Sequence, residues 1–318
     1  MDSRFAAAVA TGSRDSRAVL GTRQVRALVQ AIAPLVGAEA PDLVAAYLDQ
    51  PRHWPSVHAE AVVTDADWNA VLACVARRAA GAPMQYAVGK ASFRSLTLAV
   101  DERVLIPRPE TELLVDLVLQ RGPRGGVAVD VGTGSGAIAI ALATEGHFDR
   151  VIATDISLDA LDVARANALA CGAKVDFQPG DLLAFAESRK PRAETCRSLA
   201  ALGMTSSAES RCSAIVSNPP YIAFDEADAL PAGVRDWEPA LALYSSQGGL
   251  AHTRRLVAQA APMLQDQGLL ALEVDARRAS LVAEMVAADD RYAQVSVELD
   301  LTGRERFVLA VRRNGADS

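Results

Sequence analysis

The sequence predicts an α/β protein in which a small all-α domain and a β-hairpin linker precede a larger domain built on a mostly parallel sheet. Its length of 318 residues favours two domains at roughly 150 residues each. Residues 22–87 carry apolar side chains at helical spacing without a strand signal, whereas short apolar strands alternate with helices after residue 109. The final two predicted strands are too close for a helical crossover, so the last strand is expected to run antiparallel.

The first segment, residues 1–87, is the predicted helical domain, and residues 1–21 are expected to be disordered. Apolar residues recur at helical spacing in two stretches, with Val25, Leu28, Val29 and Ile32 in the first and Leu43, Val44, Tyr47 and Leu48 in the second. Thr64 is expected to cap a further helix, which Gly81-Ala82-Pro83 ends. Residues 88–107 are expected to form the hairpin linker, with its turn at Asp101-Glu102 between strands marked by Phe93, Leu96, Leu98, Val100, Val104 and Leu105.

The remaining segment, residues 108–318, alternates predicted helices and strands, which is typical of a parallel sheet with helices on both faces. Strands are expected at 127–131, 151–154, 214–217, 268–274, 295–299 and 306–311, and helices at 112–119, 137–144, 158–170 and 249–264. Residues 186–213 interrupt this alternation and are rich in Ser, Ala, Arg and Glu. Because loops beyond about 12–15 residues are uncommon, we expect a surface insertion there, with a weak helix at 197–204.

The composition excludes several classes of protein. Half of the residues are hydrophobic and 22% are charged, as in a globular protein, and the net charge of −7 argues against binding driven by phosphate neutralisation. No apolar run approaches the roughly 18 residues that cross a bilayer, and the N-terminus lacks the features of a signal peptide. We therefore expect a cytoplasmic protein. The four cysteines and four histidines lack zinc-ligand spacing, so no metal is expected.

A glycine-rich turn and two acids are the first candidate ligand site. In Asp130-Val131-Gly132-Thr133-Gly134-Ser135-Gly136, glycines let the backbone approach a ligand at a helix start. Alone, this spacing fits a dinucleotide site, a nucleoside site or tight packing. Asp155 ends the next strand and is suited to ribose hydroxyls, although it could also cap the following helix. Asp181 follows the third strand and could meet an adenine amino group, with Leu182 packing on the ring.

The most specific motif is Asn218-Pro219-Pro220-Tyr221, which follows the strand predicted at 214–217. Ligands of open α/β sheets bind at these strand ends. The Asn218 side chain and the Pro219 carbonyl both present acceptors, and Tyr221 offers a flat aromatic face. Two acceptors that converge on one NH₂ group are suited to a planar amino or amide nitrogen. A proline-rich turn with a packed tyrosine would contain the same residues without that function.

With these motifs in this order, the sequence resembles S-adenosyl-L-methionine-dependent methyltransferases that act on a planar nitrogen. More narrowly, it resembles the release factor glutamine methyltransferases, the PrmC or HemK family. The resemblance covers residues 22–313. Beyond the motifs above, it rests on Pro83-Met84-Gln85-Tyr86 with Gly89, Leu105-Ile106-Pro107-Arg108-Pro109-Glu110-Thr111-Glu112, Glu238-Pro239-Ala240-Leu241-Ala242-Leu243 and Leu301-Thr302-Gly303-Arg304-Glu305-Arg306.

The resemblance implies a Rossmann-like class I methyltransferase domain behind a helical domain that recruits the protein substrate. It implies N5-methylation of the glutamine in the Gly-Gly-Gln motif of class 1 peptide chain release factors, with S-adenosyl-L-methionine as methyl donor. The expected partners are release factors, without nucleic acid or membrane, and the chain is expected to be a monomer. Carried over by position, the cofactor would be bound by Gly132, Thr133, Gly134, Ser135, Gly136, Asp155, Asp181, Leu182 and Asn218. The substrate would be bound by Asn218, Pro219, Pro220 and Tyr221, of which Asn218, Pro219 and Tyr221 would be catalytic.

The chain departs from the family pattern in the segment 186–213, at Asp275-Ala276-Arg277-Arg278 and at Gln247-Gly248-Gly249, all outside the core motifs. Three alternatives remain: a glutamine methyltransferase of a ribosomal protein, an adenine-N6 nucleic-acid methyltransferase, and a non-catalytic cofactor-binding module. The acidic charge counts against nucleic acid, and the intact motifs count against a non-catalytic module. Arg108 and Glu110 could line the cofactor pocket or anchor the hairpin. No dedicated base is visible among the motifs.

Overall fold

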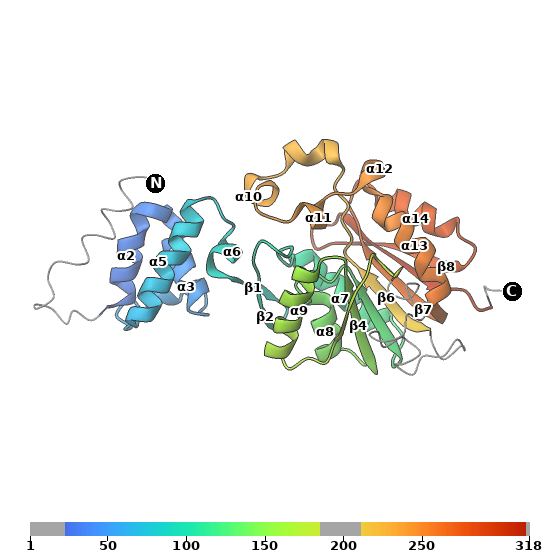
Figure 1. Ribbon diagram of the computed structural model, residues 1–318, viewed down its shortest axis with the longest axis horizontal. Coiled ribbons are helices and arrows are strands. Elements are labelled where there is room, and N and C mark those ends of the chain that lie inside the picture. The colour runs from blue at the N-terminus through green and yellow to red at the C-terminus, as the bar shows by residue number, and fades with distance from the viewer. Residues whose placement is uncertain (1–22, 185–210, 316–318) are drawn as a thin grey trace, which may run out of the picture. The chain divides into compact units, whose positions relative to one another are not determined.

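The computed structural model describes residues 23–184 and 211–315, which fold as two compact units (Figure 1). The first unit ends at Ala80 and the second begins at Gly81. The segment predicted to be disordered, the weak helix expected at 197–204 and nearly all of the predicted insertion lie outside the described residues. Each unit is described by itself.

The first unit consists of short helices around an apolar core. Its elements are α2 (Val25–Val36), η1 (Gly37–Glu39), α3 (Ala40–Tyr47), α4 (Trp54–Val57) and α5 (Asp65–Ala79). The core includes Leu28, Ile32 and Leu43, which lie at the predicted helical spacing, together with Val71 and Val75 of α5. Thr64 caps α5 as predicted: its hydroxyl accepts a hydrogen bond from the backbone N–H of Asp67 at 3.0 Å.

By length and composition alone, the 23-residue stretch Val25–Tyr47 could cross a bilayer, which the count of consecutive apolar residues did not indicate. Core helices of globular domains pass the same test. Gly37 interrupts this stretch with a backbone φ of 61°, and Leu28 and Ile32 are fully buried within the unit. The length and composition of this stretch are therefore only weak evidence for a membrane-spanning helix.

The second unit begins with α6 (Met84–Val88) and the hairpin of β1 (Lys90–Phe93) and β2 (Leu96–Ala99). The predicted position of the turn is wrong: Phe93 pairs with Leu96, which puts the turn at Arg94-Ser95 rather than at Asp101-Glu102. Val104, expected in a strand, instead belongs to a buried cluster with Tyr86, whose hydroxyl donates to the Val104 carbonyl at 2.5 Å. Its apolar character reflects burial and not strand pairing.

The sheet of the second unit confirms the predicted fold class. Seven strands lie in the order β5-β4-β3-β6-β7-β9-β8, and all neighbours are parallel except β9, which is antiparallel to both β7 and β8. The strands are β3 (Val127–Val131), β4 (Arg150–Asp155), β5 (Asp176–Pro179), β6 (Cys212–Ser217), β7 (Leu264–Glu273), β8 (Tyr292–Leu299) and β9 (Glu305–Arg312). The order reverses between β3 and β6, and such a switch point is where open α/β sheets bind ligands.

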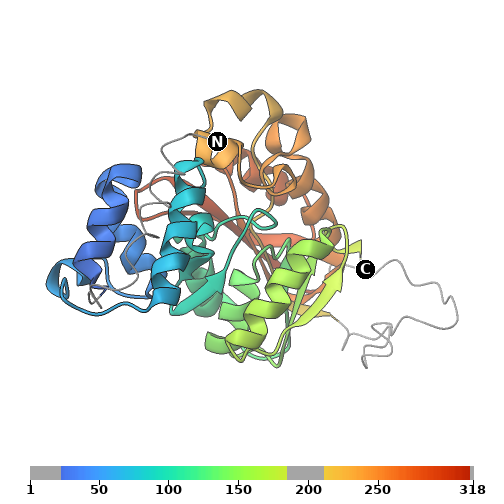
Figure 2. The ribbon, with the colours of Figure 1, turned by 60° about the vertical axis from the view of Figure 1, so that its left-hand side comes forward.

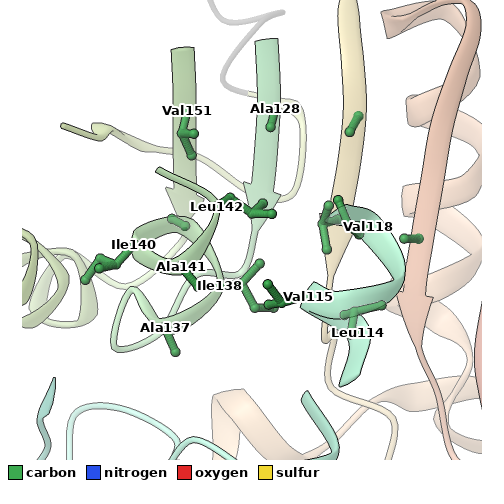
Figure 3. Packing of buried hydrophobic residues seen from close by; sticks show 14 of the residues in the cluster. Leu114, Val115, Val118, Ala128, Ala137, Ile138, Ile140, Ala141, Leu142 and Val151 are labelled. Atoms are coloured by element: carbon green, nitrogen blue, oxygen red, sulfur yellow. The ribbon is translucent and has the colours of Figure 1, made fainter. Parts of the chain in front are cut away.

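Helices cover both faces of this sheet (Figure 2). On one face, α7 (Pro109–Arg121), α8 (Ala137–Glu145) and α9 (Leu158–Ala170) pack on side chains such as Ala128 and Val151 (Figure 3). On the other face, α13 (Ala251–Met263) and α14 (Ala279–Ala287) pack on the alternate residues, such as Val129 and Ile152. Between β6 and α13 the chain forms η5 (Phe224–Ala229), α10 (Ala232–Arg235), α11 (Ala240–Leu243) and α12 (Ser246–Gly249).

Candidate active site

The glycine-rich turn connects β3 to α8 in a left-handed backbone conformation. Gly132 and Gly134 have φ values of 72° and 54°, and a Cβ added at either would meet no atom within 4 Å. At Gly136, an added Cβ would lie 3.2 Å from the Cβ of Ala164 in α9. The first two glycines are therefore required by backbone conformation and border open space, whereas Gly136 is also required by close helix packing.

Asp155 is fixed by backbone donors at the end of β4. Its Oδ2 accepts from the N–H of Gly134 and its Oδ1 from the N–H of Ser157, both at 2.9 Å. Ser157, and not Asp155, caps α9, because the Ser157 hydroxyl accepts from the N–H of Ala160. Burial raises the pKa of Asp155, while the backbone hydrogen bonds lower it. A carboxylate has about four acceptor positions, so Asp155 can accept further hydrogen bonds from a ligand.

Asp130 lies fully buried beneath the same turn, and the sequence motif gave it no separate role. Its Oδ2 accepts from the Thr133 hydroxyl at 2.6 Å and from the N–H of Ala139 at 3.1 Å. Within the described residues, its Oδ1 has no hydrogen-bond partner. Burial raises the pKa of Asp130 to about 7. The carboxyl group thus ties the turn to the start of α8.

Most of the residues predicted to bind a cofactor line one pocket at the carboxyl ends of the strands. This first pocket encloses about 820 Å³ of empty space, open solvent at its mouth included. Its lining includes Gly132, Gly134, Asp155, Asp181, Leu182 and Asn218, together with Pro220, which was expected to bind substrate. Lining residues that were not predicted to bind the cofactor include Ile156, Leu241, His252 and the hairpin-exit residues Arg103, Val104 and Leu105.

Three of the predicted cofactor residues do not line this pocket. Thr133 is buried and donates to Asp130, and Ser135 is buried with its carbonyl accepting from Asn167 at 2.9 Å. Gly136 packs closely against α9. These residues shape the turn from behind. Asp181 does line the pocket, but its Oδ2 already pairs with Arg255 at 2.7 Å.

Asn218 lies at the end of β6 and is oriented by a buried chain of hydrogen bonds. Its Nδ2 donates to the Thr111 hydroxyl oxygen at 3.1 Å, and the Thr111 hydroxyl donates to Glu273 Oε2 at 2.6 Å. The Tyr221 hydroxyl lies 3.5 Å from Glu273 Oε1. Thr111 comes from the first turn of α7 and Glu273 from the last residue of β7. The structure therefore brings two predicted residues together with two partners that the sequence did not assign.

A second pocket adjoins the first at Asn218. It is lined by Asn218, Pro219, Tyr221 and Arg108, and otherwise by the apolar side chains of Leu105, Ile222, Leu230, Val234, Ala242 and Leu243. Pro219 and Pro220 thus face different pockets. Asn218 is shared by both pockets, so a group held by its side chain would lie between two ligands.

Arg108 and Glu110 were expected either to line the cofactor pocket or to anchor the hairpin, and neither residue fits one of these roles alone. Arg108 lines the second pocket rather than the first, and its guanidinium pairs with the buried carboxylate of Glu238. Glu238 also accepts from the backbone N–H of Ile106, which ties the end of the hairpin linker to the segment before α11. Arg108 therefore lines the second pocket and, through Glu238, also helps to anchor the end of the hairpin linker. The negative charge of Glu110 raises the pKa of the buried Glu273.

Glu273 is a buried carboxyl group at the same end of the sheet. Burial raises its pKa to about 7, although the Thr111 hydroxyl and the charge of Arg306 lower it. A glutamate directly after the apolar run 269–272 was the signal that could have identified it from the sequence. Burial also raises the pKa of the Tyr221 hydroxyl, so this group is neutral at pH 7. Across the described ranges, no group of three His, Cys, Asp or Glu side chains could hold a metal ion.

One family departure lies directly against Tyr221, and another pairs with the segment that follows it. A Cβ added at Gly249 would lie 2.2 Å from the Tyr221 carbonyl oxygen, and Gly249 has a φ of 86°. Arg277 and Arg278 both pair with Asp275 and with Glu226 of η5, at 2.6 to 2.9 Å. This ion network connects the end of β7 to the segment that follows Tyr221.

Comparisons with known proteins cover both units. Residues 23–89 match the family model of the PrmC N-terminal domain, and residues 128–235 match that of a methyltransferase domain. The release factor glutamine methyltransferase of Deinococcus radiodurans is 41% identical over 248 residues, which are 76% of this chain and 78% of that protein. Those of Moorella thermoacetica and Mycolicibacterium smegmatis are 41% and 40% identical, over 74% and 75% of this chain and 77% and 78% of theirs.

Proposed function

This chain belongs to the release factor glutamine methyltransferase family, and from that membership we propose its reaction. It transfers the methyl group of S-adenosyl-L-methionine to the side-chain amide nitrogen of the glutamine in the Gly-Gly-Gln motif of class 1 release factors. The observation that carries the proposal is Asn218: its NH₂ group is used by Thr111, which leaves its carbonyl oxygen for a ligand at the junction of two pockets.

The first pocket suits the methyl donor. The open space beside Gly132 and Gly134 admits a ligand close to the backbone, and Asp155 has acceptor positions left for ribose hydroxyls. Ile156 and Leu182 offer apolar surface to adenine, and Asp181 keeps its Oδ1 for the amino group. When bound, S-adenosyl-L-methionine supplies a methyl group on a cationic sulfur.

The second pocket suits the glutamine side chain. The Asn218 Oδ1 and the Pro219 carbonyl accept the two N–H groups of the substrate amide, and Tyr221 packs on the amide plane. An amide nitrogen is a poor nucleophile because its lone pair is delocalised into the carbonyl. Two fixed acceptors favour the positive charge that develops as the N–C bond forms and the C–S bond breaks, after which one N–H proton leaves to solvent. Orientation contributes up to about 7–11 kcal/mol in well-aligned reactions.

The helical unit is proposed to recruit the release factor, and its match to the PrmC N-terminal domain supports this proposal. Among users of an Asn-Pro-Pro-Tyr motif, the net charge of −7 favours a protein over a nucleic acid as substrate. A planar amide fits the same pair of acceptors as an adenine amino group, so the identity of the substrate needs a direct test.

The test incubates the protein and labelled S-adenosyl-L-methionine with release factor or with DNA. We expect label on the release factor only, and none when its Gly-Gly-Gln glutamine is replaced by alanine. Asn218→Ala should lower methylation by at least about 10²- to 10³-fold, the effect of removing one preorganised polar partner. Part of the affinity for S-adenosylhomocysteine should remain, because Asn218 is one of several residues that line the first pocket. Label on DNA alone, or full activity of the Asn218→Ala variant, would overturn the proposal.

A further inference from the structure

A buried carboxylate behind Asn218 has no part in the reaction as described so far. Glu273 is 1% exposed and Thr111 is 4% exposed. The Thr111 oxygen lies between Glu273 Oε2 at 2.6 Å and Asn218 Nδ2 at 3.1 Å. In the part of the chain that the structure describes, Glu273 makes no ion pair, and both of its side-chain hydrogen bonds come from hydroxyls. Burying a charge without a cationic partner is costly, so this arrangement calls for a function.

The chemistry of the three groups fixes the direction of each hydrogen bond. An ionised carboxylate only accepts, and a hydroxyl has a single proton. The Thr111 proton therefore goes to Glu273, and the Thr111 oxygen can only accept from Asn218. Asn218 must then turn its NH₂ group toward Thr111 and its carbonyl oxygen away. In the opposite orientation, the NH₂ group of Asn218 would face the NH₂ group of the substrate.

We propose that Glu273, acting through Thr111, is a positioning residue that holds Asn218 in the orientation that accepts hydrogen bonds from the substrate amide. The inference rests on the proposed function, because the orientation matters only when the ligand of Asn218 is a donor. It adds a reason for the buried carboxylate and a reason for a hydroxyl at position 111.

Protonation of Glu273 would remove this directionality. A neutral carboxyl group can donate to the Thr111 oxygen, which frees the Thr111 proton for the Asn218 carbonyl and permits the flipped amide. Arg306 on β9 opposes protonation of Glu273, and Glu110 on α7 favours it. Arg108 and Asp275 act in opposite senses on the neighbouring Tyr221 hydroxyl, which contacts Glu273. Burial raises the pKa of Glu273 to about 7, so activity should fall as the pH drops through this range.

The test compares substitutions that keep or remove each polar group. Glu273→Gln preserves size but can donate to Thr111, and should lower kcat/KM roughly 10- to 100-fold, as expected for losing a hydrogen bond to a charged group. Thr111→Val should cause a similar loss, and Thr111→Ser should restore most of it. The double variant should fall little below either single one, because both changes break the same chain of bonds. S-adenosylhomocysteine affinity and the thermal midpoint serve as controls for cofactor binding and folding.

Two readouts separate positioning from a merely structural role. The acidic limb of the wild-type kcat/KM profile, near pH 7, should disappear in Glu273→Gln. By NMR, the wild type should show a nuclear Overhauser contact between the Asn218 amide protons and the Thr111 methyl group, weakened in Glu273→Gln. Wild-type activity in Glu273→Gln, an unchanged acidic limb, an unchanged contact, or a loss in Thr111→Ser equal to that in Thr111→Val would each overturn the inference. If release factor is not methylated at all, the proposed function fails, whereas the NMR contact still tests the positioning.

Discussion

The two sides of the candidate site are held in place by different kinds of hydrogen bond. On the glycine-turn side, residues 132–136 with Asp155, the bonds involve the backbone: Gly132 and Thr133 donate to the Thr154 carbonyl, and Gly134 donates to Asp155. On the asparagine side, residues 218–221 with Thr111 and Glu273, the bonds join side chains from α7, β7 and the segment that follows β6. The first side is local in sequence, and the second is assembled from distant segments.

This difference predicts that the two sides fail separately. A substitution on the glycine-turn side should weaken cofactor binding and leave transfer at saturating cofactor nearly intact. A substitution on the asparagine side should lower transfer and leave cofactor binding nearly intact. Asn218 lines both pockets, so the strongest tests of this separation use residues other than Asn218.

Among residues other than Asn218, the largest effect is expected at Gly249, on the asparagine side. Gly249→Ala would place a Cβ 2.2 Å from the Tyr221 carbonyl oxygen, which forces the Tyr221 backbone to move. Displacement of a reacting group by about 1 Å can cost about 10²-fold in rate. We expect kcat/KM for methylation to fall by at least that factor, while calorimetry finds S-adenosylhomocysteine affinity within about threefold of wild type.

The neighbouring Gly248 provides a matched control. Its φ of 64° is also left-handed, but an added Cβ would meet no atom within 4 Å. Gly248→Ala should cost stability by about 1–2 kcal/mol and leave transfer intact. Equal losses of cofactor affinity and transfer in Gly249→Ala would contradict the separation of the two sides.

The next largest effect is expected at Asp155, on the glycine-turn side. Asp155→Asn keeps an oxygen for only one of its two backbone donors, Gly134 or Ser157, and removes the charge that accepts from ribose. Hydrogen bonds to charged groups contribute about 1.5–3 kcal/mol, so the Kd for S-adenosylmethionine should rise by roughly 10- to 150-fold. At saturating cofactor, kcat should stay close to wild type.

Asp181→Asn is the control for Asp155→Asn, because both acids line the same pocket. Asp181→Asn keeps an oxygen for the adenine amino group. Asp181 is half-exposed and paired with Arg255, and such surface pairs contribute about 0–1 kcal/mol. The Kd of the Asp181→Asn variant for S-adenosylmethionine should therefore change by less than about fivefold. A loss of kcat in Asp155→Asn as large as its loss of affinity would show that this acid also positions the reacting groups.

The same contrast explains what the sequence could predict. Gly132, Asp155 and Asn218 each follow a short apolar strand, and the carboxyl ends of parallel strands meet at one edge, so their meeting could be expected. Thr111 and Glu273 are 162 residues apart in the chain, and nothing local indicates that their side chains touch. The hairpin turn was misplaced for a related reason, since the burial of Val104 against Tyr86 resembles strand patterning in the sequence.

The smallest effect is expected from the Tyr221 hydroxyl. Its 3.5 Å separation from Glu273 is at the limit of a hydrogen bond, whereas the Thr111 contact to the same carboxylate is 2.6 Å. Tyr221→Phe keeps the aromatic face and should lower kcat/KM by no more than about threefold. Tyr221→Leu removes the face and should lower it further. If Tyr221→Phe instead matched Glu273→Gln, the buried carboxylate would act through Tyr221, and the orientation of Asn218 would not depend on Thr111.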